Sequence, residues 1–477
     1  MADRVDTLIL HGDVFTMTGG GVGAIDDGAV AVDGDRIAAV GPSDRLATEF
    51  SAAETVDASG FAVLPGLVDG HVHSPEALIR GVAQDVPDYM ERAMAPFSRA
   101  LTADLWLAGT RLNVLESLKA GTTTHVDFTT PYDGWAEFYD EVGVRARLTP
   151  KINGLAPDAM AQAHGAPYRF DDAKGRRMLD VADDFARTWH GAAAGRITVM
   201  LGPQAPDMLS KELLRRVKEH AECADLMIHM HVAQGDREIH QMLTRYGIRS
   251  IPFLDELGIL DSRLYAVHLT EATDDEVRRM VRCETSMGLC SASIGLLDGI
   301  VPPAVRFRNE GGAVALGTDS ATSNNALSLF NEMRLTALFN KVKARAPDVV
   351  PAWEALRMAT VEGARAVGLG DSIGSLVAGK QADLILIDLA QLNLAPVLRA
   401  PIRNIVPNLV YAATGHEVDS VMVAGRFLMR GRRILTADET AVRRDAQEAA
   451  DEVMRRVLAD PDHRKLALLD AMRDGRL

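Results

Sequence analysis

The sequence predicts an α/β protein in which a (β/α)8 TIM barrel is combined with a small β-sandwich domain formed from both chain ends. Three observations support this prediction. Short apolar runs alternate with helix-like stretches through the middle of the chain, strand-and-turn patterns occupy both ends, and 477 residues suit one large barrel with an appendage. With 47% hydrophobic and 25% charged residues, the composition is that of a folded globular protein.

The two ends of the chain share a pattern of short strands and tight turns. Near the N-terminus, alternating apolar residues flank a Gly34-Asp35 turn, which is typical of a β-hairpin. After residue 370, apolar runs at 383–388 and 420–425 are followed by another hairpin around Gly431. We therefore expect residues 1–61 and 369–437 to form the sandwich, 62–368 the barrel, and 438–477 a charged helical tail.

Eight apolar runs in the middle of the chain are expected to be parallel strands. Amphipathic stretches such as 105–119, 211–223 and 274–282 lie between them. Repeated β-then-α units build a parallel sheet with right-handed crossovers, and eight units close into a barrel. The runs start near Ala62, Thr122, Arg145, Ile197, Leu226, Leu264, Ser286 and Ala313.

Charge and composition exclude several classes of partner. The formal net charge is −15, so neither nucleic acid nor an anionic membrane is an expected partner. No apolar stretch approaches the roughly 18 residues of a membrane span, and the N-terminus lacks the pattern of a secretory leader, which predicts a cytoplasmic protein. The three cysteines are too few for a disulfide framework, and we expect buried free thiols. A small-molecule substrate and a homo-oligomer are the expected partners.

Metal-ligating residue types gather at the expected ends of four strands. Catalytic side chains of a (β/α)8 barrel lie at the C-terminal ends of its strands. The first run ends in His71-Val-His73, and side chains two residues apart on a strand point the same way. His231 ends the fifth run, His268 the sixth and Asp319 the eighth. Because imidazole and carboxylate groups hold divalent cations, this placement predicts a metal site.

Four longer motifs surround these residues. They are P-G-L-V-D-G-H-V-H at 65–73, A-G-T-T-T-H-V-D at 120–127, G-T-D-S-A-T-S-N-N at 317–325 and A-D-L-I-L-I at 382–387. With them the chain resembles, over nearly its whole length, the amidohydrolase superfamily, in the branch that contains atrazine and triazine hydrolases, cytosine-type deaminases and adenosine-homologue deaminases. The resemblance implies that His71, His73, His231, His268 and Asp319 are metal ligands, with Asp319 beside a metal-bound water.

The resemblance also implies the number of metal ions. The fourth run ends in M-L-G-P-Q at 200–204 and offers no lysine that could become a carbamylated bridge between two ions. One divalent ion is therefore expected, Zn²⁺ in the first place and Fe²⁺ as the alternative. Lys151, at the end of the third run, is the one residue that could complicate this assignment. We consider it either a substrate contact or a solvated charge on the rim.

Two positions depart from the pattern of the deaminase branch. That branch usually has a proton-shuttling glutamate in H-x-x-E after strand five and a histidine in G-P-H-A-P after strand four, whereas this chain has Gln234 and Gln204. A neutral amide donates and accepts hydrogen bonds but does not relay protons, and general acid–base help is worth about 10²–10⁴ in rate. Glu238 and Glu271 are the two candidates for the missing acid, with a solvated or structural role as the alternative for each.

Two further residues are candidates for the substrate pocket. His125 in the second run is either a pocket wall or a core histidine. Asn324 either contacts the substrate or helps to begin a helix, because Ser-Asn-Asn is also an N-terminal cap sequence.

These features favour a metal-dependent hydrolase that cleaves a non-peptide C–N bond of an amide- or urea-like small molecule by attack of metal-activated water. Phenylurea hydrolases of the superfamily are one such precedent. The first alternative is a deaminase or dechlorinating hydrolase of an aminated N-heterocycle of the triazine, pyrimidine, purine or pterin type. The second alternative is a metal-bound binding protein without catalytic activity.

Overall fold

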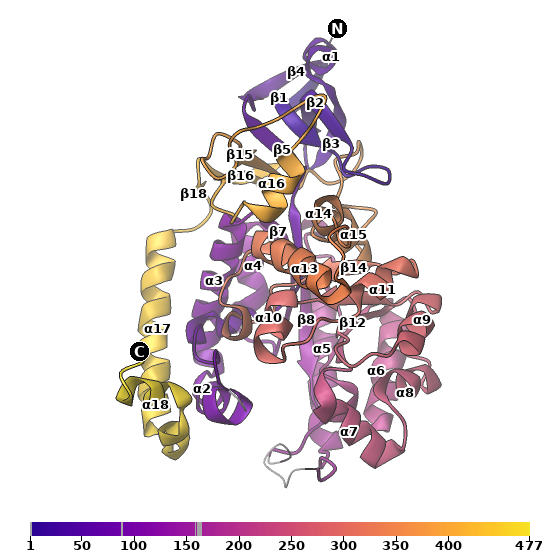
Figure 1. Ribbon diagram of the computed structural model, residues 1–477, viewed down its shortest axis with the longest axis vertical. Coiled ribbons are helices and arrows are strands. Elements are labelled where there is room, and N and C mark those ends of the chain that lie inside the picture. The colour runs from indigo at the N-terminus through magenta and orange to yellow at the C-terminus, as the bar shows by residue number, and fades with distance from the viewer. Residues whose placement is uncertain (1, 87–88, 158, 160–164) are drawn as a thin grey trace.

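Both ends of the chain contribute to one nine-stranded sheet in the computed structural model, which describes residues 2–86, 89–157, 159 and 165–477 (Figure 1). The strand order is β18-β17-β16-β15-β5-β1-β2-β3, and β4 pairs with β1. The antiparallel pair β5 and β15 joins the two ends of the chain. The bounds are β1 Asp3–Phe15, β2 Ala24–Asp33, β3 Arg36–Pro42, β4 Phe50–Asp57, β5 Phe61–Pro65, β15 Leu384–Asp388, β16 Val418–Val423, β17 Arg426–Arg430 and β18 Arg433–Ile434.

Two tight turns hold the two ends of the chain together. The expected hairpin at Gly34 connects β2 to β3, and a second two-residue turn at Ala424-Gly425 connects β16 to β17. Gly425 has φ +74°, and a Cβ atom there would lie 1.9 Å from the carbonyl oxygen of Gly34. Only glycine therefore suits this position, both for its backbone conformation and for the close approach of the other turn.

Parallel strands form a five-stranded and a four-stranded sheet below the nine-stranded one (Figure 1). The bridges Leu201–Ile228 and Val72–Asp319 connect the edges of these two sheets, so the pairing runs in a closed circuit. The fourth position of the circuit is shared by the two short strands β9 and β10. The bounds are β6 Leu67–Val72, β7 Thr122–Thr129, β8 Arg145–Ile152, β9 Ile197–Val199, β10 Gly202–Pro203, β11 Ile228–Val232, β12 Leu264–His268, β13 Ser286–Leu289 and β14 Val314–Leu316.

The first of these strands begins later than the sequence pattern indicates. The apolar residues 61–65 form β5, which pairs with β1 and β15 in the nine-stranded sheet, and the parallel strand β6 begins at Leu67. The expected border between residues 61 and 62 thus falls inside β5. Gly66 makes the tight transition between the two strands, because a Cβ atom there would lie within 2.1 Å of the Thr123 side chain.

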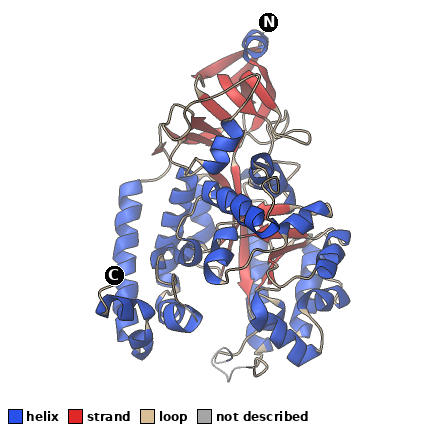
Figure 2. Ribbon diagram, viewed as in Figure 1, coloured by secondary structure: helices blue, strands red, loops and turns tan. Residues whose placement is uncertain are grey.

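Helices surround the parallel strands (Figure 2), which gives the mixed α/β content that the sequence predicts. Side-chain and backbone caps begin several of them, including a capping box of Thr273 and Glu276 at α9. The bounds are α1 Ser43–Glu49, α2 Ala95–Ala100, α3 Ala103–Lys119, α4 Trp135–Val142, α5 Asp172–Trp189, α6 Lys211–Ala224, α7 Gly235–Tyr246, α8 Ser250–Glu256, α9 Asp274–Arg282, α10 Ser291–Leu297, α11 Ala304–Asn309, α12 Ala321–Asn324, α13 Leu329–Ala344, α14 Ala352–Met358, α15 Val361–Ala366, α16 Ile405–Tyr411, α17 Glu439–Ala459 and α18 Ala467–Arg473.

The C-terminal tail packs on the segment that follows the first parallel strand. Helix α17 buries Ala446, Ala449 and Val453 in an apolar cluster with Phe97 of α2 and with Ile79 of the 3-10 helix η1 (Ser74–Ile79). Within the described part of the chain, no helix is both long enough and apolar enough to cross a membrane. The thiol of Cys290 is buried as expected, whereas Cys223 is exposed and Cys283 is half-buried, because both lie at the ends of surface helices.

Candidate metal centre

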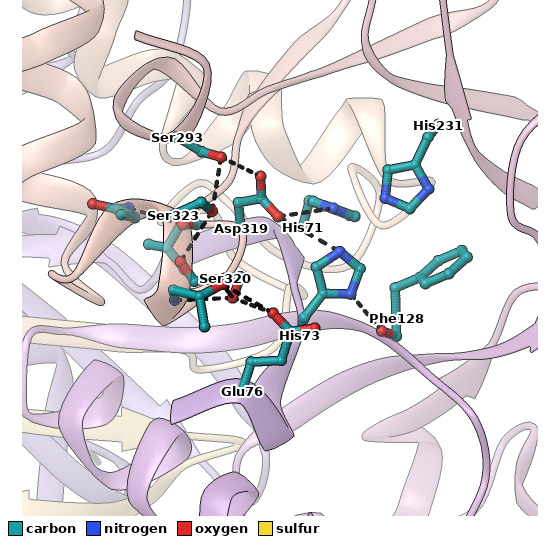
Figure 3. Close-up of polar contacts among 12 residues, drawn as sticks. His71, His73, Glu76, Phe128, His231, Ser293, Asp319, Ser320 and Ser323 are labelled. Carbon is teal, nitrogen blue, oxygen red and sulfur yellow. Dashed lines mark hydrogen bonds and ion pairs between the residues drawn. The ribbon is translucent and has the colours of Figure 1, made fainter. Parts of the chain in front are cut away.

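The tips of the first and last parallel strands meet at the expected metal ligands. Asp319 N donates a hydrogen bond to His71 O at 2.8 Å, and His73 N donates to Asp319 O at 3.2 Å. These backbone bonds bring the Asp319 side chain to His71 of β6 and to His73, which directly follows that strand (Figure 3). The Oδ1 atom of Asp319 lies 3.5 Å from Nε2 of His71 and 3.5 Å from Nε2 of His73.

The other two histidines lie against the same group. The ring centre of His231 is 4.9 Å from that of His71, and the ring centre of His268 is 5.5 Å from it. Candidate ligand atoms of His71, His231 and His268 all lie within 4.8 Å of one another, as do those of His71, His73 and Asp319. The five predicted ligands therefore come together around His71.

Hydrogen bonds at the far nitrogen orient three of the rings. Nδ1 of His73 lies 2.7 Å from the carbonyl oxygen of Phe128, and Nδ1 of His231 lies 2.8 Å from that of Gln204. Because a carbonyl oxygen only accepts, these Nδ1 atoms carry the proton and each Nε2 keeps its lone pair. Nδ1 of His71 is 2.8 Å from Nε2 of His229. Nε2 of His71 is buried without a hydrogen-bond partner among the described residues, as expected of a nitrogen that takes a cation.

Burial favours the neutral form of three of the rings, which is the form that binds metal. It lowers the pKa of His71, His231 and His268, that of His268 to about 3. Asp319 behaves in the opposite way. Burial alone would raise its pKa, but the contact with His71 and the neighbouring imidazoles hold the pKa well below its ordinary value. The centre thus combines neutral imidazoles with one ionised carboxylate, and this donor set fits a divalent cation.

A serine that the sequence analysis did not single out fixes the Asp319 carboxylate. Ser293 Oγ in α10 donates to Asp319 Oδ2 at 2.6 Å, while Oδ1 faces the histidines (Figure 3). Cys290, one residue before α10, offers a third candidate group with His268 and Asp319 within 4.8 Å. Both residues follow the seventh parallel strand, where only an apolar run marks the sequence, so no local pattern pointed to them.

The two glutamines lie at the ends of neighbouring strands. Gln204 follows β10, and its Oε1 accepts a hydrogen bond from Asn153 Nδ2 at 2.6 Å. Gln234 follows β11 and is the N-cap residue of α7. Its side chain makes no hydrogen bond with the part of the chain that the structure describes. The amide of Gln234 is therefore available to a ligand, and that of Gln204 is held in one orientation.

The two candidate acids differ in their surroundings. Glu238 is fully buried, and its carboxylate accepts hydrogen bonds from Ala233 N and Gln234 N and from Ser250 Oγ. These bonds hold the turn that carries Gln234, so the structure supports the structural alternative for Glu238. Burial raises its pKa. Glu271 is half-buried, and its backbone N donates to Ala233 O at 3.0 Å.

Two predicted pocket residues lie outside the cluster. His125 is buried on β7 with its Nε2 2.7 Å from Ser117 Oγ of α3, so it faces the helices as a core histidine. Phe128, three residues later, points to the other face of β7 and contacts His73. Asn324 donates from Nδ2 to Thr318 O and to Glu332 Oε1, and thereby braces the loop after Asp319.

Two family models match the chain. The model of the Amidohydrolase family matches residues 62–428, and an Imidazolonepropionase-like composite domain of bacteria matches residues 28–50. A 5-methylthioadenosine/S-adenosylhomocysteine deaminase of Desulforudis audaxviator is 37% identical over 90% of this chain and 96% of its own. A 5'-deoxyadenosine deaminase of Methanococcoides burtonii is 34% identical over 95% of this chain and 99% of its own.

Solved structures show the same similarity. An adenosine deaminase from Xanthomonas campestris with bound zinc superposes with a TM-score of 0.86 at 30% identity, over 95% of this chain and 100% of that one. The fold is shared with an atrazine chlorohydrolase from Arthrobacter aurescens, which superposes with a TM-score of 0.80 at 22% identity, over 93% of this chain and 100% of that one. Such neighbours have a TIM barrel with a small extra domain. The prediction of a metal-dependent hydrolase that acts on non-peptide C–N bonds is confirmed. The chain belongs to the amidohydrolase family.

Proposed function

We propose that this chain removes the amino group of an adenosine-type compound by hydrolysis, with one Zn²⁺ ion held by His71, His73, His231, His268 and Asp319. The observation that carries the proposal is the convergence of neutral imidazole nitrogens on the ionised Asp319. Fe²⁺ is the alternative ion, since the same ligands suit it. When bound, a divalent cation lowers the pKa of water from about 15.7 to about 7 and so supplies a nucleophile at neutral pH.

The protein's own residues handle the protons and the orientation. Asp319 accepts a proton from the attacking water at Oδ1, because Oδ2 is already engaged by Ser293. The same carboxylate then passes the proton to the departing amino group. The amides of Gln204 and Gln234 hydrogen-bond the planar substrate at the ends of β10 and β11, and hold the reacting carbon over the cluster.

A second candidate function is hydrolysis of an amide or urea. Gln234 favours it, because a neutral residue at this position suits a substrate whose carbonyl needs no protonated ring nitrogen. The relatives of similar length, which are deaminases of adenosine-type compounds, favour the first candidate.

We also propose a division of the chain. The closed circuit of parallel strands supports a (β/α)8 barrel, and the sheet built from both ends supports a separate small β domain. The expected borders after residues 368 and 437 are kept, and the first border is moved to follow β5 at Pro65.

Release of ammonia by the purified, zinc-loaded protein tests the proposed function. Adenosine, 5'-deoxyadenosine and 5'-methylthioadenosine are assayed beside an anilide and a phenylurea, with Asp319→Asn as the inactive control. We expect ammonia from the adenosine-type compounds alone. Turnover confined to the anilide or the phenylurea would establish the second candidate in its place.

A further inference from the structure

Lys151 lies at the level of the metal ligands, on a strand that contributes none of them. Thr149 on β8 points to the interior of the circuit, since its Oγ1 lies 3.1 Å from Nδ1 of His229. Side chains two residues apart on a strand share a face, so Lys151 points the same way, one step nearer the C-terminal end. On β11, His231 lies two residues beyond His229, just as Lys151 lies two residues beyond Thr149 on β8. Lys151 and His231 therefore occupy the same level of the interior.

One short strand, β10, lies between β8 and β11. Gly202 of β10 is the register partner of Lys151, and a Cβ atom there would lie 2.7 Å from Pro150 O and from Thr149 Cγ2, so β10 packs closely against β8. Two residues further on, Gln204 binds His231 Nδ1 through its carbonyl oxygen. Lys151 is thus separated from a metal ligand by one short strand. Its side chain points to the interior of the circuit, on the face that carries Thr149.

The ammonium group of Lys151 is unpaired within the described ranges of the chain. Glu76 is the acidic group whose charge acts on it, but Oε2 of Glu76 already accepts hydrogen bonds from Ser320 and Thr322 (Figure 3). Lys174 of α5 carries the same positive charge and therefore repels the protonated form of Lys151. Burial lowers the pKa of Lys151, and Lys174 adds to this effect while Glu76 opposes it. A half-buried cation without a counterion at this level is suited to meet a substrate.

We propose that Lys151 is the proton donor to the ring nitrogen of the substrate. The neutral amide of Gln234 cannot fill this role, because it does not relay protons. This inference rests on the proposed deaminase function. The Lys151 ammonium gives a proton to the ring nitrogen next to the amino-bearing carbon as water adds to that carbon. The bond to the amino group breaks and ammonia leaves, taking one proton of the water. The other proton of the water restores the ammonium, so that the net change is C(=N)–NH₂ plus H₂O to C(=O)–NH plus NH₃.

Chemical rescue of a lysine variant tests this role. We expect Lys151→Ala to lose about 10²–10⁴ in kcat, the usual contribution of a general acid, while its zinc content stays unchanged. Added methylamine or ethylamine restores part of the rate, because a small primary amine can enter the space that the side chain leaves. Lys151→Arg stays inactive, since a guanidinium does not give up its proton. Lys218→Ala on the surface helix α6 is the matched control and keeps wild-type activity.

A labelling experiment gives a readout that does not depend on turnover. Trinitrobenzenesulfonate reacts only with unprotonated amines, so the metal-free protein should be modified faster at Lys151 than at Lys218, and adenosine should slow the reaction at Lys151. Ammonia release that is unaffected by Lys151→Ala, or full activity of Lys151→Arg, would overturn this inference alone. A wild-type protein that releases no ammonia from any adenosine-type compound would overturn the proposed function and this inference with it.

Discussion

Removal of the Ser293 hydroxyl group should weaken metal binding although no metal ligand is replaced. Ser293 Oγ donates to Asp319 Oδ2 at 2.6 Å, and both groups are buried. A hydrogen bond to a charged group contributes about 1.5–3 kcal/mol, and each 1.4 kcal/mol corresponds to a factor of about ten. Ser293→Ala should therefore weaken zinc binding, kcat or both by about 10- to 100-fold, the range that residues behind metal ligands usually show.

A neighbouring serine provides the control for this experiment. Ser291 lies on the same helix and is equally buried, but its hydroxyl is bonded to Thr336 Oγ1 at 2.7 Å and not to Asp319. Zinc affinity is measured by competition with a chromogenic chelator, and kcat by ammonia release. Ser291→Ala should match the wild type in both. Equal effects of the two substitutions would refute the reasoning, because the loss would then reflect packing of α10.

Three further predictions concern the fold and the stability of the site. Gly425→Ala should cost about 1–3 kcal/mol and lower Tm, because φ is +74° and the new Cβ would meet Gly34 O, whereas Gly431→Ala, at φ +53° with open space around it, should cost less. Burial raises the pKa of Glu332 to about 8, above the value of about 4.5 in the unfolded chain, so the free energy of unfolding should fall as pH rises from 5 to 8, and Glu332→Gln should flatten that dependence in thermal melts. Chelation of the metal should lower Tm by calorimetry, since saturation at 100 times Kd stabilises by about 2.7 kcal/mol; an unchanged Tm would contradict a cation bound at the cluster.

Local patterns predicted the parts of the site that lie on single strands. His71 and His73 form an H-x-H pair at a strand end, and such a pair needs only the two-residue period of a strand to face one ion. The same period puts His125 and Phe128 on opposite faces of β7, and in the structure His125 contacts Ser117 of α3 while Phe128 contacts His73.

The remaining features depend on contacts between distant segments. Ser293 reaches Asp319 across 26 residues, and Glu76 reaches Ser320 across 244 residues, with no shared motif. The border at β5 is hidden for another reason. Both the nine-stranded sheet and the parallel strands need apolar residues, so the run from residue 61 to residue 72 gives no sign that two strands follow each other at Gly66.

The central claim is that imidazoles and Asp319 hold one divalent cation together. X-ray absorption at the zinc edge, on protein loaded with one equivalent of Zn²⁺, tests this claim most directly. We predict a first coordination shell of nitrogen and oxygen only, with imidazole scattering that diminishes in His231→Ala. A sulfur ligand, which Cys290 beside His268 and Asp319 could provide, or an unchanged spectrum in His231→Ala, would contradict the account.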